Sequence, residues 1–256
     1  MACRLLPGLW YMTFAADFRR VTSRGALITA IGTDEATFDA VLTFEPPRTR
    51  EEQKTAAHLT AGAIQIADIP IFFRHDIPKR NPHRGHRTVW EPLLAKLEYK
   101  ALARRLETFL QVTLPGYPHD AVYGYRLGRN IRENAAAHAG HEALLTVDLR
   151  DFFPSISRDR IAQLFEMLGI EAEVADLLAR FVTIGGGLPL GLPTSPVLSN
   201  AVALPLDLAC EALAKTTDAT YTRYADDLTF SSDRELPDLS GDFISRTPRR
   251  TFASII

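Results

Sequence analysis

The chain is short of cysteine and of net charge, and it has no long apolar run. Its two cysteines, Cys3 and Cys210, are far apart and in no metal-ligand spacing. This argues against a disulfide-built secreted domain and favours a reducing compartment. The formal net charge of the 256 residues is −2. Any binding of nucleic acid must therefore come from a local basic patch and not from the whole surface.

From this sequence we expect neither a membrane span nor an export signal. No segment approaches the length of apolar residues that is needed to span a bilayer. Residues 1–14 are mostly apolar with a single Arg4, but they contain no clean apolar core and no convincing small-residue cleavage site. We therefore expect a cytoplasmic protein with no membrane partner.

The composition and the apolar patterns predict a folded protein that contains both helices and strands. Hydrophobic residues make up 46% and charged residues 23% of the chain, which is typical of globular proteins and not of disordered ones. Interleaved strand and helix patterns predict an α+β or mixed α/β class. Segments 26–31 and 38–44 fit short helices or strands, and 45–54 reads as a solvated loop. The periodicity predicts helices over 91–112, 158–169, 171–183 and 195–215, the last kinked at Pro205, and strands over 142–149, Thr220–Tyr224 and 228–231.

Three carboxylates carry the sharpest chemical signal. Asp226 and Asp227 are adjacent, at the tip of a predicted hairpin between two apolar strands, and Asp148 ends another buried strand. Neighbouring carboxylates repel each other and lose hydration when partly buried, which a divalent cation offsets. Acidic oxygens converging from two strands suit Mg²⁺, and two such ions can activate a hydroxyl and neutralise a leaving pyrophosphate.

The two adjacent carboxylates should not contribute equally. Successive residues of a strand face opposite sides, so we expect Asp226 to be the direct ligand and Asp227 to assist. The alternative is that the pair forms an ordinary hairpin turn and that Asp148 is a strand-end cap. For an isolated Asp-Asp pair this alternative is the better one.

Five segments, in order along the chain, resemble reverse transcriptases and specifically the bacterial retron group. Any one of these motifs is weak, but five in order are hard to obtain by chance. They span roughly residues 69–233. The segments are 77–79 with 87–89, Asn-Ala-Ala-Ala-His at 134–138, Val-Asp-Leu-Arg-Asp-Phe-Phe-Pro-Ser-Ile at 147–156, Leu-Pro-Leu-Gly-Leu-Pro-Thr-Ser-Pro at 188–196 with Leu-Ser-Asn at 198–200, and Tyr-Thr-Arg-Tyr-Ala-Asp-Asp-Leu-Thr-Phe-Ser at 221–231.

The resemblance implies a fold and a catalytic centre. The fold would be the α+β fingers and palm of a reverse transcriptase, an antiparallel palm sheet backed by helices. Asp148 and Asp226 would bind two Mg²⁺ ions, with Asp227 assisting and Mn²⁺ as a substitute metal. The chain would divide into an N-terminal region of unknown role (1–68), fingers and palm (69–240) and an atypical tail (241–256). The helical thumb of the family would be missing.

The same resemblance assigns a nucleotide site. Lys79 and Arg87 would reach the triphosphate, as a point charge and a planar fork. Phe153 would exclude a ribose 2′-hydroxyl and so select deoxynucleotides. Leu190 and Gly191 lie in the nucleotide-positioning motif, but Leu190 stands where most relatives carry Gln, a side chain that can donate a hydrogen bond. Considered alone, the cations fit a solvated loop and Phe153 fits core packing beside Phe152.

Nucleic acid has two further candidate contacts. The basic run 74–87 offers a backbone-binding surface, and its histidines lack the further ligands of a metal site. Asn134 and His138 are four residues apart and would share a helix face. The retron signature at these two positions suggests binding to RNA, whereas hydrogen bonds to the palm would explain them equally well.

The activity implied is RNA-directed DNA polymerisation of retron type. The enzyme would add deoxynucleoside triphosphates to a primer on a structured RNA, the retron non-coding RNA, and would act in phage defence with an effector protein. One alternative is an inactive truncated remnant or an RNA-binding subunit, which the missing thumb and Leu190 favour. A group II intron-type enzyme is a third, which the 134–138 signature disfavours.

Overall fold

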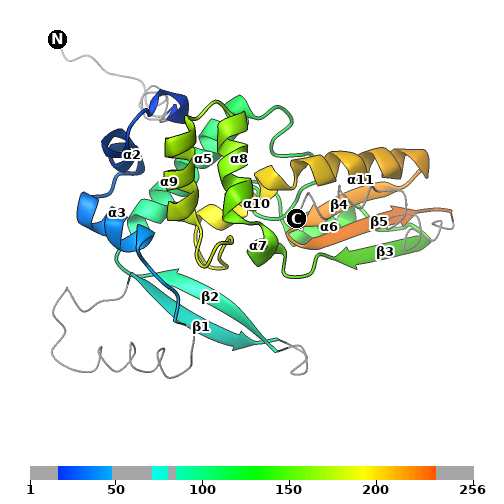
Figure 1. Ribbon diagram of the computed structural model, residues 1–256. Coiled ribbons are helices and arrows are strands. Elements are labelled where there is room, and N and C mark those ends of the chain that lie inside the picture. Colours follow the sequence, from blue (N-terminus) through cyan, green and yellow to red (C-terminus); the bar gives the residue numbers. More distant parts are fainter. Residues whose placement is uncertain (1–16, 48–70, 80–84, 235–256) are drawn as a thin grey trace, which may run out of the picture.

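The computed structural model describes residues 17–47, 71–79 and 85–234, and these form an α+β protein with two small antiparallel sheets (Figure 1). The strands are β1 (Phe72–Pro78), β2 (His86–Pro92), β3 (Ala143–Asp148), β4 (Thr220–Tyr224) and β5 (Asp227–Ser232). The helices are η1 (Phe18–Arg20), α2 (Arg24–Ile31), α3 (Glu35–Leu42), α5 (Lys96–Thr113), α6 (Ile131–Ala136), α7 (Phe152–Ser155), α8 (Arg158–Met167), α9 (Ala172–Val182), α10 (Thr194–Val202) and α11 (Leu204–Thr216).

The three-stranded sheet has the order β3-β5-β4, as the alternating pattern predicts. Asp148, the last residue of β3, lies opposite Asp227, the first residue of β5. The link between β4 and β5 is the two-residue turn Ala225-Asp226, so Asp226 projects from the same end of the sheet. α11 packs against β4 on one face of this sheet (Figure 1). The predicted α+β class and the three predicted palm strands are confirmed.

The second sheet is the β1–β2 hairpin, which extends away from the helices (Figure 1). The basic run 74–87 therefore begins and ends in paired strands. The helix predicted over 91–112 is wrong at its start, because β2 continues to Pro92 and α5 begins at Lys96. The pairing of Phe72 with Pro92 keeps this segment extended.

Side-chain caps fix where several helices begin. Ser23, Asp34 and Ser157 each accept a hydrogen bond from the backbone amide three residues further on, at the starts of α2, α3 and α8. Asn130 and Glu133 form a reciprocal capping box at the start of α6. Such a cap contributes about 1 kcal/mol by satisfying an amide that the helix leaves unpaired. The sequence of segments 26–31 and 38–44 fits either helix or strand; in the structure the first is helical throughout and the second is helical as far as Leu42.

The described N-terminal residues share the hydrophobic core of the rest. Phe18 packs edge-on against Phe109 of α5, with ring centroids 5.5 Å apart. Phe38 of α3 stacks on Phe181 of α9 at 5.4 Å. These helices therefore lock the N-terminal segment onto the helical layer that carries α8 and α9 (Figure 1). The division at residue 68 stays a prediction, and the whole predicted tail, 241–256, lies outside the described residues.

The helix predicted over 195–215 is two helices, α10 and α11, bent by 50° at Ala203. Pro205 lies in the first turn of α11, where its missing amide costs nothing, whereas within one continuous helix its ring would clash with the preceding turn. The sequence predicted one helix kinked at Pro205, whereas the structure has two separate helices. No single helix of the described segments is long and apolar enough to cross a membrane, although α10 and α11 together meet that criterion by length and composition.

Candidate active site

A cavity of about 1830 Å³ lies where the β1–β2 hairpin faces the end of the β3-β5-β4 sheet. Its walls come from the described residues at the ends of β1 and β2, the β3–α7 turn, the loop before α10 and the β4–β5 turn. It is lined by Lys79, Gly85, His86, Arg87, Thr88, Trp90, Tyr125, Asp148, Leu149, Arg150, Asp151, Phe152, Phe153, Pro154, Ile184, Gly185, Gly187, Leu188, Pro189, Leu190 and Asp226.

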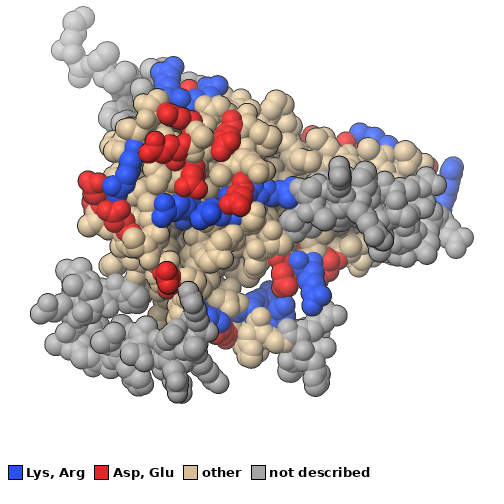
Figure 2. All heavy atoms as spheres, viewed as in Figure 1, with Lys and Arg blue, Asp and Glu red and all other residues tan. Residues whose placement is uncertain are grey.

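Charge is unevenly distributed around this site. On the face in Figure 2, Asp and Glu gather over α8 and α9, while Lys and Arg lie below them and around the gap between the hairpin and the sheet. The cavity is lined by three cations, Lys79, Arg87 and Arg150, and by three carboxylates, Asp148, Asp151 and Asp226. A chain with almost no net charge thus still gathers three cations at one cavity, the local attraction that binding to a phosphate chain requires.

Two of the three predicted carboxylates, Asp148 and Asp226, line the cavity together. A backbone hydrogen bond from the Leu149 amide to the Asp226 carbonyl, 2.9 Å long, ties the end of β3 to the turn that carries Asp226. Asp227 begins β5 opposite Asp148 and is not part of the lining. The structure therefore separates the two adjacent carboxylates, as strand alternation predicts.

Burial and the two neighbouring carboxylates make Asp227 harder to ionise. The pKa of Asp227 lies above its ordinary value because of partial burial first, and then because of the negative charges of Asp226 and Asp148. A cation at this end of the sheet would relieve that repulsion, and the cavity supplies carboxylate oxygens, the donor type that Mg²⁺ prefers. Among the described residues no group of three or more His, Cys, Asp or Glu side chains is set to hold a metal by itself. The donor set therefore fits an ion that keeps water and substrate oxygens as its other ligands.

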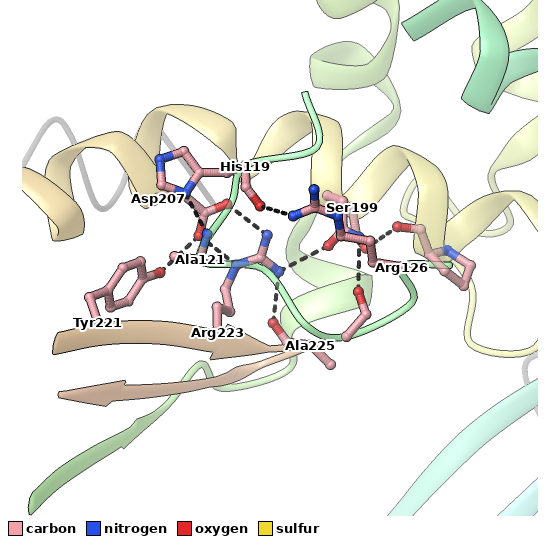
Figure 3. A network of polar contacts seen from close by, with 11 residues as sticks. His119, Ala121, Arg126, Ser199, Asp207, Tyr221, Arg223 and Ala225 are labelled. Atoms are coloured by element: carbon pink, nitrogen blue, oxygen red, sulfur yellow. Dashed lines mark hydrogen bonds and ion pairs between the residues drawn. The ribbon is translucent and has the colours of Figure 1, made fainter. Parts of the chain in front are cut away.

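The β4–β5 turn is held from behind by a buried polar network (Figure 3). Ala225 adopts φ +58°, a left-handed conformation that is unusual for a residue with a side chain. The Arg223 guanidinium donates to the Ala225 carbonyl at 2.9 Å and to Asn200 Oδ1 at 3.1 Å, and its charge is paired with Asp207 of α11. The turn that presents Asp226 is therefore fixed by a cation that no solvent reaches.

The same turn is covered by the segment before α6. The Asn200 amide donates to the Gly124 carbonyl at 3.2 Å, and the Tyr123 amide donates to the Arg223 carbonyl at 2.9 Å. A Cβ atom at Gly124 would lie 2.5 Å from the backbone nitrogen of Ala225. Only glycine allows the two backbones to approach this closely.

The predicted nucleotide residues are brought together, with one exception. Lys79, Arg87, Phe153 and Leu190 all line the cavity, and Lys79 Nζ lies 3.5 Å from Asp151 Oδ1. Gly191 does not line it. Its φ is +103°, and a Cβ there would overlap the Trp90 carbonyl oxygen, so this glycine permits contact between the loop before α10 and β2. The Trp90 amide donates to the Leu190 carbonyl at 2.7 Å in the same contact.

Phe153 belongs to both the core and the cavity. Its side chain is 6% exposed and meets Phe152 edge to face, with centroids 5.4 Å apart. A second edge-to-face contact joins it to Tyr125 at 5.9 Å. The two interpretations of Phe153, core packing and a wall of the nucleotide site, are therefore both compatible with its position.

Two groups of site residues were not predicted from the sequence. Tyr125 lines the cavity, yet nothing in its local pattern marks it. Arg223 and Asp207 stand in an apolar strand and an apolar helix, and both are fully buried. A charge inside an otherwise apolar segment requires a buried partner, and this was the one signal that pointed to them.

The structure corrects the geometry expected for Asn134 and His138. They do not share a helix face, because α6 ends at Ala136 and His138 follows it. Both ring nitrogens of His138 are within hydrogen-bond distance of hydroxyls on the sheet, Ser231 Oγ at 2.7 Å and Thr222 Oγ1 at 2.6 Å. His138 thus fastens the segment after α6 to the three-stranded sheet, and binding of RNA by this pair stays a prediction.

Comparison with known proteins agrees with this geometry. Residues 77–240 match the reverse transcriptase (RNA-dependent DNA polymerase) family. The chain is 39% identical over 211 residues to the retron Mx65 reverse transcriptase of Myxococcus xanthus, covering 73% of this chain and 48% of that protein. It is 39% identical to the retron Mx162 enzyme of the same organism (60% and 34% covered) and 32% identical to the retron Ec86 enzyme of Escherichia coli (71% and 56%). The chain thus spans about half the length of these relatives or less.

Proposed function

Because this chain belongs to the reverse transcriptase family and is similar to its retron members, we propose that it is the fingers and palm of an RNA-directed DNA polymerase. One observation carries the proposal. A single cavity is lined by the carboxylates Asp148 and Asp226, by the cations Lys79 and Arg87, and by the ring of Phe153. This combination provides for a metal, a triphosphate and a sugar within one site.

Asp148 and Asp226 would hold Mg²⁺, or Mn²⁺ in its place. Two such ions, when bound, lower the pKa of the attacking hydroxyl and neutralise the leaving pyrophosphate. The role of the chain itself is positioning. The buried Arg223 network and the 2.9 Å hydrogen bond from Leu149 to Asp226 hold the two carboxylate-bearing segments in one arrangement before any substrate enters.

Lys79 and Arg87 would bind the triphosphate from the hairpin side. Lys79 is already paired with Asp151 at 3.5 Å, so it would exchange a carboxylate partner for a phosphate. Arg87 is exposed and offers a planar fork that suits phosphate oxygens. The two cations belong to the β1–β2 hairpin and the carboxylates to the end of the three-stranded sheet, so a nucleotide bound by both would have its α-phosphate near the carboxylates.

Phe153 would select the sugar. Its ring is nearly buried and packs against Phe152, so it cannot yield easily to a larger ligand. A ribose 2′-hydroxyl differs from deoxyribose by one oxygen, and a fixed wall at that position excludes it. Deoxynucleoside triphosphates are therefore the proposed substrates.

The proposed template is a structured RNA, by analogy with the retron relatives, and the proposed setting is cytoplasmic phage defence with an effector protein. The second candidate is an inactive remnant or an RNA-binding subunit. Leu190 favours it, because its side chain lines the cavity and has no donor for a nucleotide.

Primer extension tests the proposal. The purified chain would be incubated with an RNA template, a DNA primer, deoxynucleotides and Mg²⁺, beside Asp226→Asn and Asp227→Asn variants. We expect extension by the wild type, a loss of roughly 100-fold or more in Asp226→Asn, and a smaller loss in Asp227→Asn, because only Asp226 lines the cavity. Circular dichroism confirms that each variant is folded.

The opposite result is equally informative. Folded, soluble wild-type protein that binds the RNA duplex without extending the primer would support the RNA-binding subunit. Wild-type activity in Asp226→Asn would remove the proposed metal site.

A further inference from the structure

The segment 121–126 is pressed against the turn that carries Asp226. Its backbone pairs with β4 on both sides of Arg223: the Arg223 amide donates to the Ala121 carbonyl at 2.8 Å, and the Tyr123 amide donates to the Arg223 carbonyl at 2.9 Å. The next residue, Gly124, lies in direct backbone contact with Ala225. This packing fixes where the following side chain, Tyr125, can point.

Tyr125 points into the active-site cavity. It adopts φ +58°, which turns its side chain away from the direction that an extended segment would give it. The residue after it, Arg126, is anchored by a 3.0 Å hydrogen bond to the His119 carbonyl and by a 3.2 Å ion pair with Asp120. The unusual conformation is therefore held from both sides, by Gly124 against the turn and by Arg126 against the preceding loop.

The partner of the Tyr125 ring is Phe153. The two rings meet edge to face, with centroids 5.9 Å apart and planes inclined by 75°. Both line the cavity, but Tyr125 is 51% exposed whereas Phe153 is 6% exposed. Phe152 supports Phe153 with a second edge-to-face contact at 5.4 Å, so Phe153 is held between two rings. Phe152 lies in the hydrophobic core, whereas Tyr125 is open to the cavity.

A wall that excludes a 2′-hydroxyl works only if it cannot move aside. An added oxygen is tolerated wherever the surrounding side chains can shift to make room, and it is rejected where packing holds them in place. We propose that Tyr125 is a positioning residue for sugar selection: its ring braces Phe153 and so sets the preference for deoxy- over ribonucleotides. This inference rests on the proposed function, in which Phe153 contacts the sugar.

The contact that matters is made by the ring and not by the hydroxyl. The Tyr125 hydroxyl has no hydrogen-bond partner within the described part of the chain, so Tyr125→Phe preserves the brace and Tyr125→Ala removes it. Leu127→Ala serves as the matched control, because Leu127 lies in the same loop and is 96% exposed. Phe153→Ala, alone and combined with Tyr125→Ala, tests whether the effect passes through Phe153.

The experiment measures binding, so that it does not depend on catalysis. Each variant is bound to an RNA template with a dideoxy-terminated DNA primer, and the Kd values of dATP and ATP are measured in Mg²⁺. Discrimination is the Kd of ATP divided by the Kd of dATP. We expect Tyr125→Ala to lower this ratio by roughly 2- to 12-fold, the range that an aromatic pair supplies. We expect Tyr125→Phe and Leu127→Ala to keep the wild-type ratio, and Tyr125→Ala to change nothing further in the Phe153→Ala background.

Several results would overturn the inference. The first is an unchanged Kd ratio in Tyr125→Ala. The second is a Kd ratio that falls as much in Tyr125→Phe as in Tyr125→Ala, and the third is a further fall when Tyr125→Ala is added to Phe153→Ala. Equal binding of dATP and ATP by the wild type would also overturn it, together with the proposed sugar selection. If the wild type discriminates in binding but extends no primer, polymerase activity of this chain fails as a proposal, and the binding ratios still decide the role of Tyr125.

Discussion

Arg223 and Asp207 form a two-bond ion pair from which solvent is excluded on both sides. The Nε and Nη2 atoms of Arg223 lie 2.7 and 2.8 Å from the two carboxylate oxygens of Asp207, and neither side chain has exposed surface. Tyr221 donates a third hydrogen bond to the same carboxylate at 2.8 Å. The pair joins α11 to β4 directly behind the turn that presents Asp226 (Figure 3).

Removing one partner of this pair should be far more damaging than removing both. Asp207→Asn leaves the guanidinium charge buried and unpaired, and we expect the free energy of unfolding to fall by about 3–5 kcal/mol. Asp207→Leu combined with Arg223→Met replaces the pair by apolar groups and should recover most of that loss. Urea unfolding followed by circular dichroism measures both.

The double variant separates stability from function. Arg223→Met also removes the donor to the Ala225 carbonyl, so a variant with restored stability should still extend a primer more slowly than the wild type. Equal destabilisation by the single and double variants would contradict the idea that an unpaired charge is the cause.

Gly124→Ala should displace the turn that carries Asp226. A Cβ at this position lies 2.5 Å from the Ala225 nitrogen, a distance that requires one backbone to move. Overpacking of this kind costs about 1–3 kcal/mol, and here it acts next to Asp226. We expect a loss of stability and a larger loss of primer extension. Gly25→Ala is the control, because a Cβ at Gly25 meets nothing within 4 Å and alanine favours its helix, α2.

The sequence predicted the sheet well, because its strands alternate or run apolar up to a charged end. Asp148 was placed at the end of a strand and Asp226 in a turn, and the structure confirms both positions. The β1–β2 hairpin was harder to predict. Its residues Arg74 to Asp76 are basic or acidic, and β1 is buried only at its Phe72 end and exposed from His75 onward, so no apolar alternation marks the strand.

The support of the site could not be predicted in the same way. A buried Arg223 becomes intelligible only when Asp207, sixteen residues earlier on another element, is known to face it. The position of Tyr125 depends on a backbone contact between Gly124 and Ala225, 101 residues apart in the chain, which no local pattern records. Local propensity placed the carboxylates, whereas tertiary packing decides what holds them.

His138 should make stability depend on pH. Its pKa is lowered, first by burial and then by the neighbouring His141, so the folded state favours the neutral ring. An unfolded His138 binds a proton near pH 6.5, so below that pH the unfolded state takes up more protons and the stabilisation from the neutral ring declines. The contribution is complete above pH 6.5 and is lost as the pH falls toward the folded pKa. Urea unfolding between pH 8 and 5 should show a steeper decline for the wild type than for His138→Gln, and parallel curves would contradict this.

Leu190→Gln should strengthen nucleotide binding. Leu190 lines the cavity, and its backbone is fixed by the 2.7 Å hydrogen bond from the Trp90 amide, so a longer polar side chain would extend into the nucleotide site from an unchanged position. Glutamine offers an amide donor that leucine lacks, and one hydrogen bond is worth roughly 0.5–1.5 kcal/mol, or about 2- to 12-fold in affinity. We expect KM for deoxynucleotides to fall by that factor in primer extension. Leu190→Met is the matched control, since methionine is of similar length and has no amide. If methionine lowers KM as much as glutamine does, the effect comes from side-chain shape, and Leu190 is not a missing donor.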